Sequence, residues 1–308
     1  MINFVLLTDF FWMYIERFIS YLQLERAYSK HTLTAYTHDI TSFQEFIHKE
    51  YPGSDISEVH YAQIRSWIVF LVHKGLSNTS VNRKISALQS FYTFLEKTET
   101  IKLNPLQGHK SLKTPRKTTT PFSKKEMTDL QNLFQYESGD FESMRNHLLI
   151  ELLYTTGIRR SELTGVQHRD IDFVSKTLKV LGKRNKERYI PLLDVTLSLI
   201  QKYTALKKKR GFTESTLLVT TKGKPVYASL VYKIVKNYFD QISTKDKRSP
   251  HVLRHAFASH LLDAGADLNL VKDLLGHASL ASTQIYTQTS LAHLKKVYKN
   301  AHPRNRKK

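Results

Sequence analysis

Several residues in the second half of the chain have side chains suited to phosphoryl chemistry. In chain order they are Arg159, Lys183, His251, Arg254, His277 and Tyr286. Two guanidinium groups can bind the non-bridging oxygens of a phosphate bidentately, and a lysine or histidine can protonate a departing alkoxide. A tyrosine hydroxyl can act as the nucleophile. The set predicts attack on a phosphodiester that needs neither a metal ion nor another cofactor.

Each of these side chains also has an ordinary structural explanation. Tyr286 is one of 16 tyrosines, and a tyrosine on a short helix is usually half-buried packing. A lysine at a hairpin tip is usually solvated, and an arginine after a helix-ending glycine commonly neutralises helix-end carbonyls. The prediction therefore depends on the order and local sequence of the whole set.

The composition favours a DNA-binding protein. The 308 residues include 47 Lys and Arg against 27 Asp and Glu, and the formal net charge of +20 attracts polyanions. No run of about 18 apolar residues is present, and Asp9 interrupts the apolar N-terminus before the first basic residue, Arg17, which argues against a signal peptide. The absence of cysteine excludes a disulfide framework and a thiolate metal site. We expect a cytoplasmic protein with no membrane partner.

The first part of the chain has a helical pattern from Ile15 to about Leu95. Apolar residues recur at three-and-four spacing, Ser29 is suited to an N-cap, and Gly75 is suited to a helix end. We expect a four-helix domain over residues 13–103.

Basic residues gather near the expected helix starts and in the segment after this domain. Those near the helix starts, which could contact phosphates or form an ordinary solvated face, are Lys30, His31, Arg83 and Lys84. Residues 104–121 are polar, basic and interrupted by prolines, which predicts a linker. A basic linker would let two basic domains lie on different faces of one DNA duplex.

Residues 122–301 are expected to form a second, mainly helical domain with a small antiparallel sheet. Ser123 and Glu126 have the spacing of a capping box, and Gly157 is placed to end a helix of buried leucines. A basic tail follows over residues 302–308.

Two further patterns place candidate residues within this domain. The β-prone runs at 177–181 and 188–192 predict a hairpin whose connection contains Lys183. Pro250 at a first helical position, after a serine N-cap, predicts a helix that carries His251 and Arg254 on one face.

The local sequences around these residues resemble those of the tyrosine recombinases, most closely the Xer type. The matching segments are Thr156–Leu163, Gly182–Arg188, Ser249–His255, Leu274–His277 and Thr283–Thr287, with further similarity at Tyr28–Thr32 and Ala301–Pro303. Arg184 is a departure, because the family usually has glycine after the lysine, and it could alter the hairpin turn. The resemblance covers essentially the whole chain after Met13 and implies a SAM-like N-terminal DNA-binding domain followed by a tyrosine recombinase catalytic domain.

The resemblance also implies a role for each candidate. The two arginines and His277 would surround the scissile phosphate and stabilise the charge of the phosphorane. His251 would accept the proton of the nucleophile Tyr286, and Lys183 would protonate the leaving 5′ oxygen. Glu162 would orient or offset the local positive charge, or would cap a helix. The product would be a 3′-phosphotyrosyl link, so neither ATP nor a divalent metal would be needed.

The implied function is site-specific recombination that resolves chromosome dimers at cell division, with the C role of the Xer type favoured over the D role. An integrase of a mobile element and a DNA-binding regulator without activity are the alternatives. A type IB topoisomerase, which uses similar chemistry, fits these segments less well. The implied partners are double-stranded DNA, further subunits in a tetramer on two DNA sites, a second Xer-type recombinase and an activating cell-division DNA translocase.

The end of the chain has a further helical pattern, formed by Leu291, Leu294, Val297 and Tyr298. In the family such a helix docks into the neighbouring subunit. Packing on its own domain is the alternative.

Overall fold

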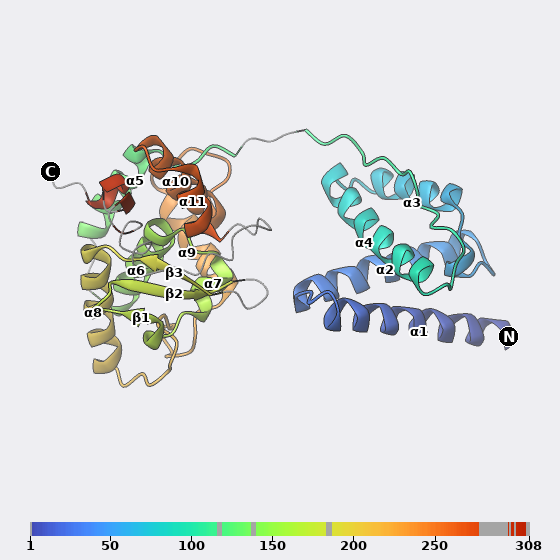
Figure 1. Ribbon diagram of the computed structural model, residues 1–308, viewed down its shortest axis with the longest axis horizontal. Helices are drawn as coiled ribbons and strands as arrows, with labels where there is room; N and C mark the ends of the chain where they lie inside the picture. The colour runs from blue at the N-terminus through green and yellow to red at the C-terminus, as the bar shows by residue number, and fades with distance from the viewer. Residues whose placement is uncertain are drawn as a thin grey trace. The chain divides into compact units, whose positions relative to one another are not determined.

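The computed structural model describes residues 2–115, 119–136, 140–182, 187–276 and 300–305, together with Lys295, Val297 and Tyr298. The chain divides into two compact units, residues 1–117 and 118–308 (Figure 1). In the described part of the chain, every helix is too short or too polar to span a bilayer.

The N-terminal unit is built from helices, as predicted. They are α1 (Ile2–Leu24), α2 (Lys30–Glu50), α3 (Tyr61–His73) and α4 (Asn78–Lys97), with the short 3₁₀ helix η1 (Ile56–Glu58) between α2 and α3. The Ser29 hydroxyl caps α2 by accepting a hydrogen bond from the backbone N–H of Thr32. Helix α1 begins ahead of the predicted domain start at residue 13, and its Phe11 is buried in the core of this unit.

The core of the N-terminal unit is rich in aromatic rings. Phe43 and Trp67 are fully buried and pack edge to face, with 5.0 Å between their ring centroids. Phe18 of α1 packs against Phe91 of α4 in the same manner. These contacts join all four helices around one core.

One of the basic residues considered for phosphate contact is buried. The Lys84 ammonium is 2.9 Å from a carboxylate oxygen of Asp39, which is itself 1% exposed. Arg83 donates hydrogen bonds to both oxygens of the same carboxylate. Because a buried carboxylate needs such partners, Lys84 belongs to the core of this unit and fits neither alternative considered for it, a phosphate contact or a solvated face.

Much of the predicted linker packs on the N-terminal unit. Leu106 is buried, and Leu112 packs against the same core. Asn82 of α4 donates to the Leu112 carbonyl at 2.8 Å and accepts from its N–H at 2.9 Å, while Asn78 donates to the Lys113 carbonyl. The polar composition of this segment therefore reflects exposed side chains on a docked backbone.

The C-terminal unit is mainly helical with one small antiparallel sheet, as predicted. Its helices are α5 (Lys124–Tyr136), α6 (Phe141–Thr156), α7 (Arg160–Gly165), α8 (Asp194–Lys209), α9 (Ala228–Asp240), α10 (Pro250–Asp263) and α11 (Leu268–Leu275). Its strands, in sheet order, are β1 (Ile171–Asp172), β2 (Thr177–Leu181) and β3 (Glu187–Pro191), and its 3₁₀ helices are η2 (His168–Asp170) and η4 (Pro303–Asn305).

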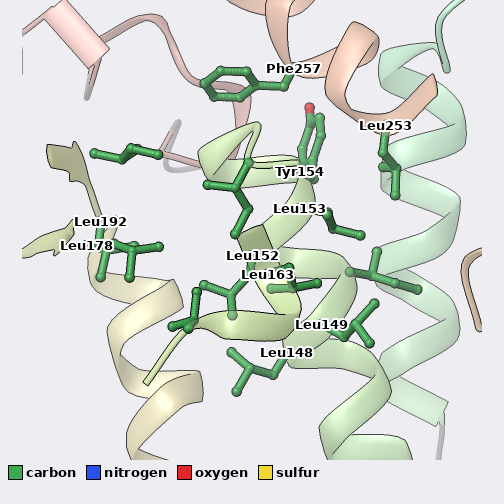
Figure 2. Packing of buried hydrophobic residues seen from close by; sticks show 14 of the residues in the cluster. Leu148, Leu149, Leu152, Leu153, Tyr154, Leu163, Leu178, Leu192, Leu253 and Phe257 are labelled. Atoms are coloured by element: carbon green, nitrogen blue, oxygen red, sulfur yellow. The ribbon is translucent and has the colours of Figure 1, made fainter. Parts of the chain in front are cut away.

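Helix α6 forms the centre of this unit. From Leu148 to Thr156 every side chain is buried, as expected of a helix surrounded by other elements. Leucines of α6 pack against Leu163, Leu178 and Leu253, which belong to α7, β2 and α10 (Figure 2). The central helix thereby links the sheet to the helices that carry the candidate residues.

Local capping signals and the hairpin are confirmed. Ser123 and Glu126 form the predicted capping box before α5. Strands β2 and β3 pair antiparallel, with Thr177 opposite Pro191 at one end of the pairing and Leu181 opposite Glu187 at the other. The additional strand β1 was not predicted, because two residues are too few to show an alternating pattern.

The described residues near the C-terminus pack on their own unit. Tyr298 is fully buried and its hydroxyl donates to the Thr155 carbonyl. His302 is also fully buried, and Arg304 forms an ion pair with Glu151 at 3.3 Å. Val297 and Tyr298 of the expected helix therefore pack on their own unit, whereas Leu291 and Leu294 lie outside the described residues.

Candidate active site

Three of the predicted residues come together around one cavity. Arg159, His251 and Arg254 line a cavity of about 560 Å³ in the C-terminal unit. Tyr232 of α9 and Ser161 of α7 contribute to its wall. The other predicted residues, which are Lys183, His277 and Tyr286, lie outside the described residues.

Arg159 is held at the start of α7 by Glu162. The Glu162 carboxylate accepts the backbone N–H of Arg159 at 2.7 Å and its guanidinium at 2.8 Å. The side chain of Arg159 remains 31% exposed, so it is open to a ligand in the cavity. Glu162 therefore both caps the helix and pairs with the positive charge around it.

His251 and Arg254 lie one turn apart near the start of α10. Ser249 is the N-cap and Pro250 begins the helix, as predicted. His251 is exposed at the cavity, whereas Arg254 is only 8% exposed. The exposed imidazole can exchange protons with a bound molecule, and the buried guanidinium is fixed in place.

Gly157 makes the buried position of Arg254 possible. It ends α6 with a φ of 60°, and its carbonyl accepts a hydrogen bond from the Arg254 guanidinium. A Cβ atom at this residue would lie 2.3 Å from the ring of Phe257. Glycine is thus required both by the backbone conformation and by the space available.

Three arginines bind three successive carbonyls at the end of α11. Arg188 donates to Leu274 at 3.0 Å, Arg254 to Leu275 at 2.6 Å, and Arg159 to Gly276 at 3.1 Å. The last carbonyls of a helix have no partner within the helix and carry its negative dipole end, so guanidinium donors stabilise them strongly. These hydrogen bonds therefore fix the end of α11, which directly precedes residue 277, against the three arginines.

Arg188 was not among the predicted site residues. It lies on β3, is 7% exposed, and binds both oxygens of Glu162 at 3.0 and 2.8 Å. The sequence did indicate that Arg188 is buried, because it lies two residues before the buried Ile190 and alternate residues of a strand share one face. A charged residue on the inward face of a strand requires a buried partner.

The charges of the site shift the pKa values of two of its members. Burial raises the pKa of Glu162, but hydrogen bonds from Arg188 and Arg159 outweigh it and hold this pKa at about 2. Burial, followed by repulsion from Arg159, lowers the pKa of Arg254 to about 10. Both groups are therefore ionised at neutral pH.

The described residues of the site carry an excess of positive charge. The guanidiniums of Arg159, Arg188 and Arg254 face the single carboxylate of Glu162. Each guanidinium has five N–H donors, so donors remain for a phosphate beyond the bonds described above. Such an arrangement can stabilise the additional negative charge that develops on a phosphodiester under attack.

The sequence and the fold match a known class of DNA-processing enzymes. Residues 121–293 match the phage integrase family, and residues 15–99 match the N-terminal SAM-like domain of phage integrases. The chain belongs to the phage integrase family, and it is a tyrosine recombinase that cleaves and rejoins DNA.

Several recombinases are similar to this chain over most of its length. The tyrosine recombinase XerC of Listeria innocua is 38% identical over 299 residues, which cover 94% of this chain and 97% of the relative. A XerH site-specific recombinase bound to a palindromic difH substrate has a TM-score of 0.68 at 19% identity, covering 94% of this chain and 92% of that one. A lambda integrase tetramer bound to a Holliday junction has a TM-score of 0.66 at 18% identity, covering 90% and 79%. The prediction of a site-specific tyrosine recombinase of the Xer type is confirmed.

Proposed function

We propose that this recombinase resolves chromosome dimers at cell division, using Arg159, Lys183, His251, Arg254, His277 and Tyr286 as its catalytic residues. The main support is that Arg159 lines the same cavity as His251 and Arg254, which lie far from it in the sequence. The proposed substrate is chromosomal DNA, which would place the activity in the cytoplasm.

In the proposed reaction the Tyr286 hydroxyl attacks the scissile phosphorus of double-stranded DNA. His251 accepts the phenolic proton, a bond forms between the tyrosine oxygen and phosphorus, and the bond from phosphorus to the 5′ oxygen breaks. Lys183 donates a proton to that 5′ oxygen. Arg159 and Arg254, with His277, bind the non-bridging oxygens as their charge grows.

The covalent product retains the energy of the original linkage. A 3′-phosphotyrosyl ester is a phosphodiester, so a 5′ hydroxyl from another strand can attack it and release Tyr286. Each step exchanges one phosphodiester for another, and the reaction is reversible without ATP. Strand exchange between two DNA sites follows when the attacking hydroxyl belongs to the second site.

The proposed assembly is a tetramer on two DNA sites. It is supported by the fold shared with lambda integrase, which forms a tetramer on a Holliday junction. The net charge of +20 supports a duplex partner whose binding weakens steeply as salt rises. A second Xer-type recombinase and an activating cell-division DNA translocase rest on the family resemblance alone.

The experiment that tests the catalytic set uses a nicked suicide duplex taken from the genomic site that the protein occupies. Tyr286→Phe should abolish the covalent adduct on a denaturing gel while DNA binding persists. Tyr232→Phe is the matched control, because Tyr232 is a tyrosine that lines the cavity. An adduct that survives in Tyr286→Phe and disappears in Tyr232→Phe would overturn the assignment of the nucleophile.

Mapping the occupied site tests the biological role. Occupancy at the replication terminus is the expected result for dimer resolution. Occupancy at the edge of a mobile element would instead favour an integrase.

A further inference from the structure

We propose that Arg188 is a positioning residue for DNA cleavage, which holds Glu162 and the end of α11 so that Arg159 stays available to the phosphate. The proposal rests on the catalytic role proposed above for Arg159. Arg188 is not among the residues that line the cavity, so it would act through its neighbours and not by contact with DNA.

Arg188 connects two elements that carry the site. Its Nη1 and Nη2 atoms bind Glu162 of α7 at 3.0 and 2.8 Å, while its Nε atom binds the Leu274 carbonyl of α11 at 3.0 Å. The side chain is also packed tightly, because a Cβ atom added at Gly276 would lie 3.2 Å from it. A single rigid guanidinium therefore sets the distance between α7 and the last turn of α11.

Arg188 also saturates the Glu162 carboxylate. Oxygen Oε1 accepts one hydrogen bond from Arg159 and one from Arg188, and Oε2 accepts the Arg159 backbone N–H together with a second bond from Arg188. Without Arg188, the Arg159 guanidinium would be the side-chain partner that remains for the two carboxylate oxygens of Glu162. Glu162 would then compete with the phosphate for Arg159.

This competition gives a pH signature that loss of packing would not give. Among the described residues, the charged groups that act on Glu162 most directly are Arg159, Arg188 and Arg254, and it also shares a cavity wall with Arg169, Asp170, Lys179 and Glu187. The hydrogen bond from Arg188 is the largest of the effects that lower the pKa of Glu162. When Arg188 is removed, the burial of Glu162 is less strongly opposed, and the pKa of Glu162 rises. Protonation of Glu162 would then release Arg159, and the variant would recover activity as pH falls.

The test measures single-turnover adduct formation on the nicked suicide duplex by Arg188→Met, Arg188→Lys and Arg188→Met/Glu162→Gln. Arg188→Met should cleave about 10- to 100-fold more slowly, since small displacements of reacting groups have effects of this size, with DNA affinity within about threefold. Its rate relative to the wild type should rise on lowering the pH. Adding Glu162→Gln should restore part of the rate at neutral pH and remove this pH dependence. Arg188→Lys should fall between the wild type and Arg188→Met, because an ammonium cannot bridge both partners.

Arg145→Met is the matched control. Arg145 is a buried arginine of α6, 2% exposed, that pairs with Glu142 away from the cavity. Arg145→Met should lower stability, but its cleavage rate relative to the wild type should not rise as the pH is lowered. All rates are measured at temperatures below the unfolding transition of each variant. The proposal is overturned if Arg188→Met cleaves at the wild-type rate. It is also overturned if Arg188→Met cleaves slowly and adding Glu162→Gln does not raise its cleavage rate at any pH. Failure of the wild type itself to form an adduct would instead count against the proposed catalytic set.

Discussion

The Arg254 guanidinium donates a hydrogen bond to the carbonyl of Gly157, the left-handed residue at which α6 ends. This bond joins the helix that carries the His-x-x-Arg pair to the turn that precedes Arg159. It depends on a backbone conformation that residues other than glycine rarely adopt. The position of Arg254, a candidate to bind the phosphate, therefore depends on Gly157.

Replacing Gly157 with alanine should disturb both stability and cleavage. The positive φ costs about 1–2 kcal/mol, and the overlap of the new Cβ atom with Phe257 adds about 1–3 kcal/mol. Urea unfolding measures the loss, and the suicide duplex measures the cleavage rate. Gly75→Ala is the control, because Gly75 has a φ of 81° with nothing within 4 Å of an added Cβ atom. Equal losses in the two variants would show that Phe257 imposes no constraint.

Glu162 should make stability depend on pH in the acid range. Its pKa is about 2 in the folded state against 4.5 as the ordinary value. Its stabilisation is therefore complete above about pH 4.5 and is lost as pH falls through about 2, with a full size of about 3 kcal/mol. The difference in unfolding free energy between the wild type and Glu162→Gln should shrink over this window. A difference that stays constant from pH 7 to pH 2 would contradict the folded-state pairing.

Asn82 should protect the segment that follows the N-terminal helices. In Asn82→Ala, the Leu112 backbone loses both of its hydrogen bonds to the Asn82 side chain. We expect trypsin to cleave after Lys110 or Lys113 about tenfold faster, as a loss of about 1.4 kcal/mol would produce. Mass spectrometry identifies the cut, and Ser86→Ala, on an exposed turn of the same helix, provides the control. Unchanged cleavage at these lysines would mean that the docked backbone does not depend on Asn82.

Arg304 should stabilise the C-terminal unit through Glu151. The two side chains are 8% and 5% exposed, and burial raises the pKa of Glu151 against the opposing effect of Arg304. Arg304→Met leaves a buried carboxylate without its cation and should cost about 3 kcal/mol at neutral pH, measured by urea unfolding. Arg304→Met/Glu151→Leu should recover most of this loss. An exposed control, Lys202→Met, should change stability by less than about 0.5 kcal/mol. A double variant no more stable than Arg304→Met would show that the charge of Glu151 is not the cause.

The parts of the fold that were predictable depend on local chemistry. The caps at Ser29 and Ser123, the helix end at Gly157 and the start at Pro250 involve residues within a few positions of each other, so short patterns reveal them. The two-residue strand β1 falls below the length at which alternation is visible. Docking of the segment around Leu112 was missed because its polar composition says nothing about backbone partners elsewhere in the chain.

The sequence by itself determined which candidate reacting groups are present and their order, and it predicted the helix starts and ends near several of them, since capping and periodicity act over one or two turns. The tertiary structure decided that Arg159, His251 and Arg254 share one cavity, that Lys84 is buried, and that Arg188 pairs with Glu162. Those outcomes arise from contacts between residues far apart in the chain. Burial in such contacts determines which charges must pair and which remain for a phosphate.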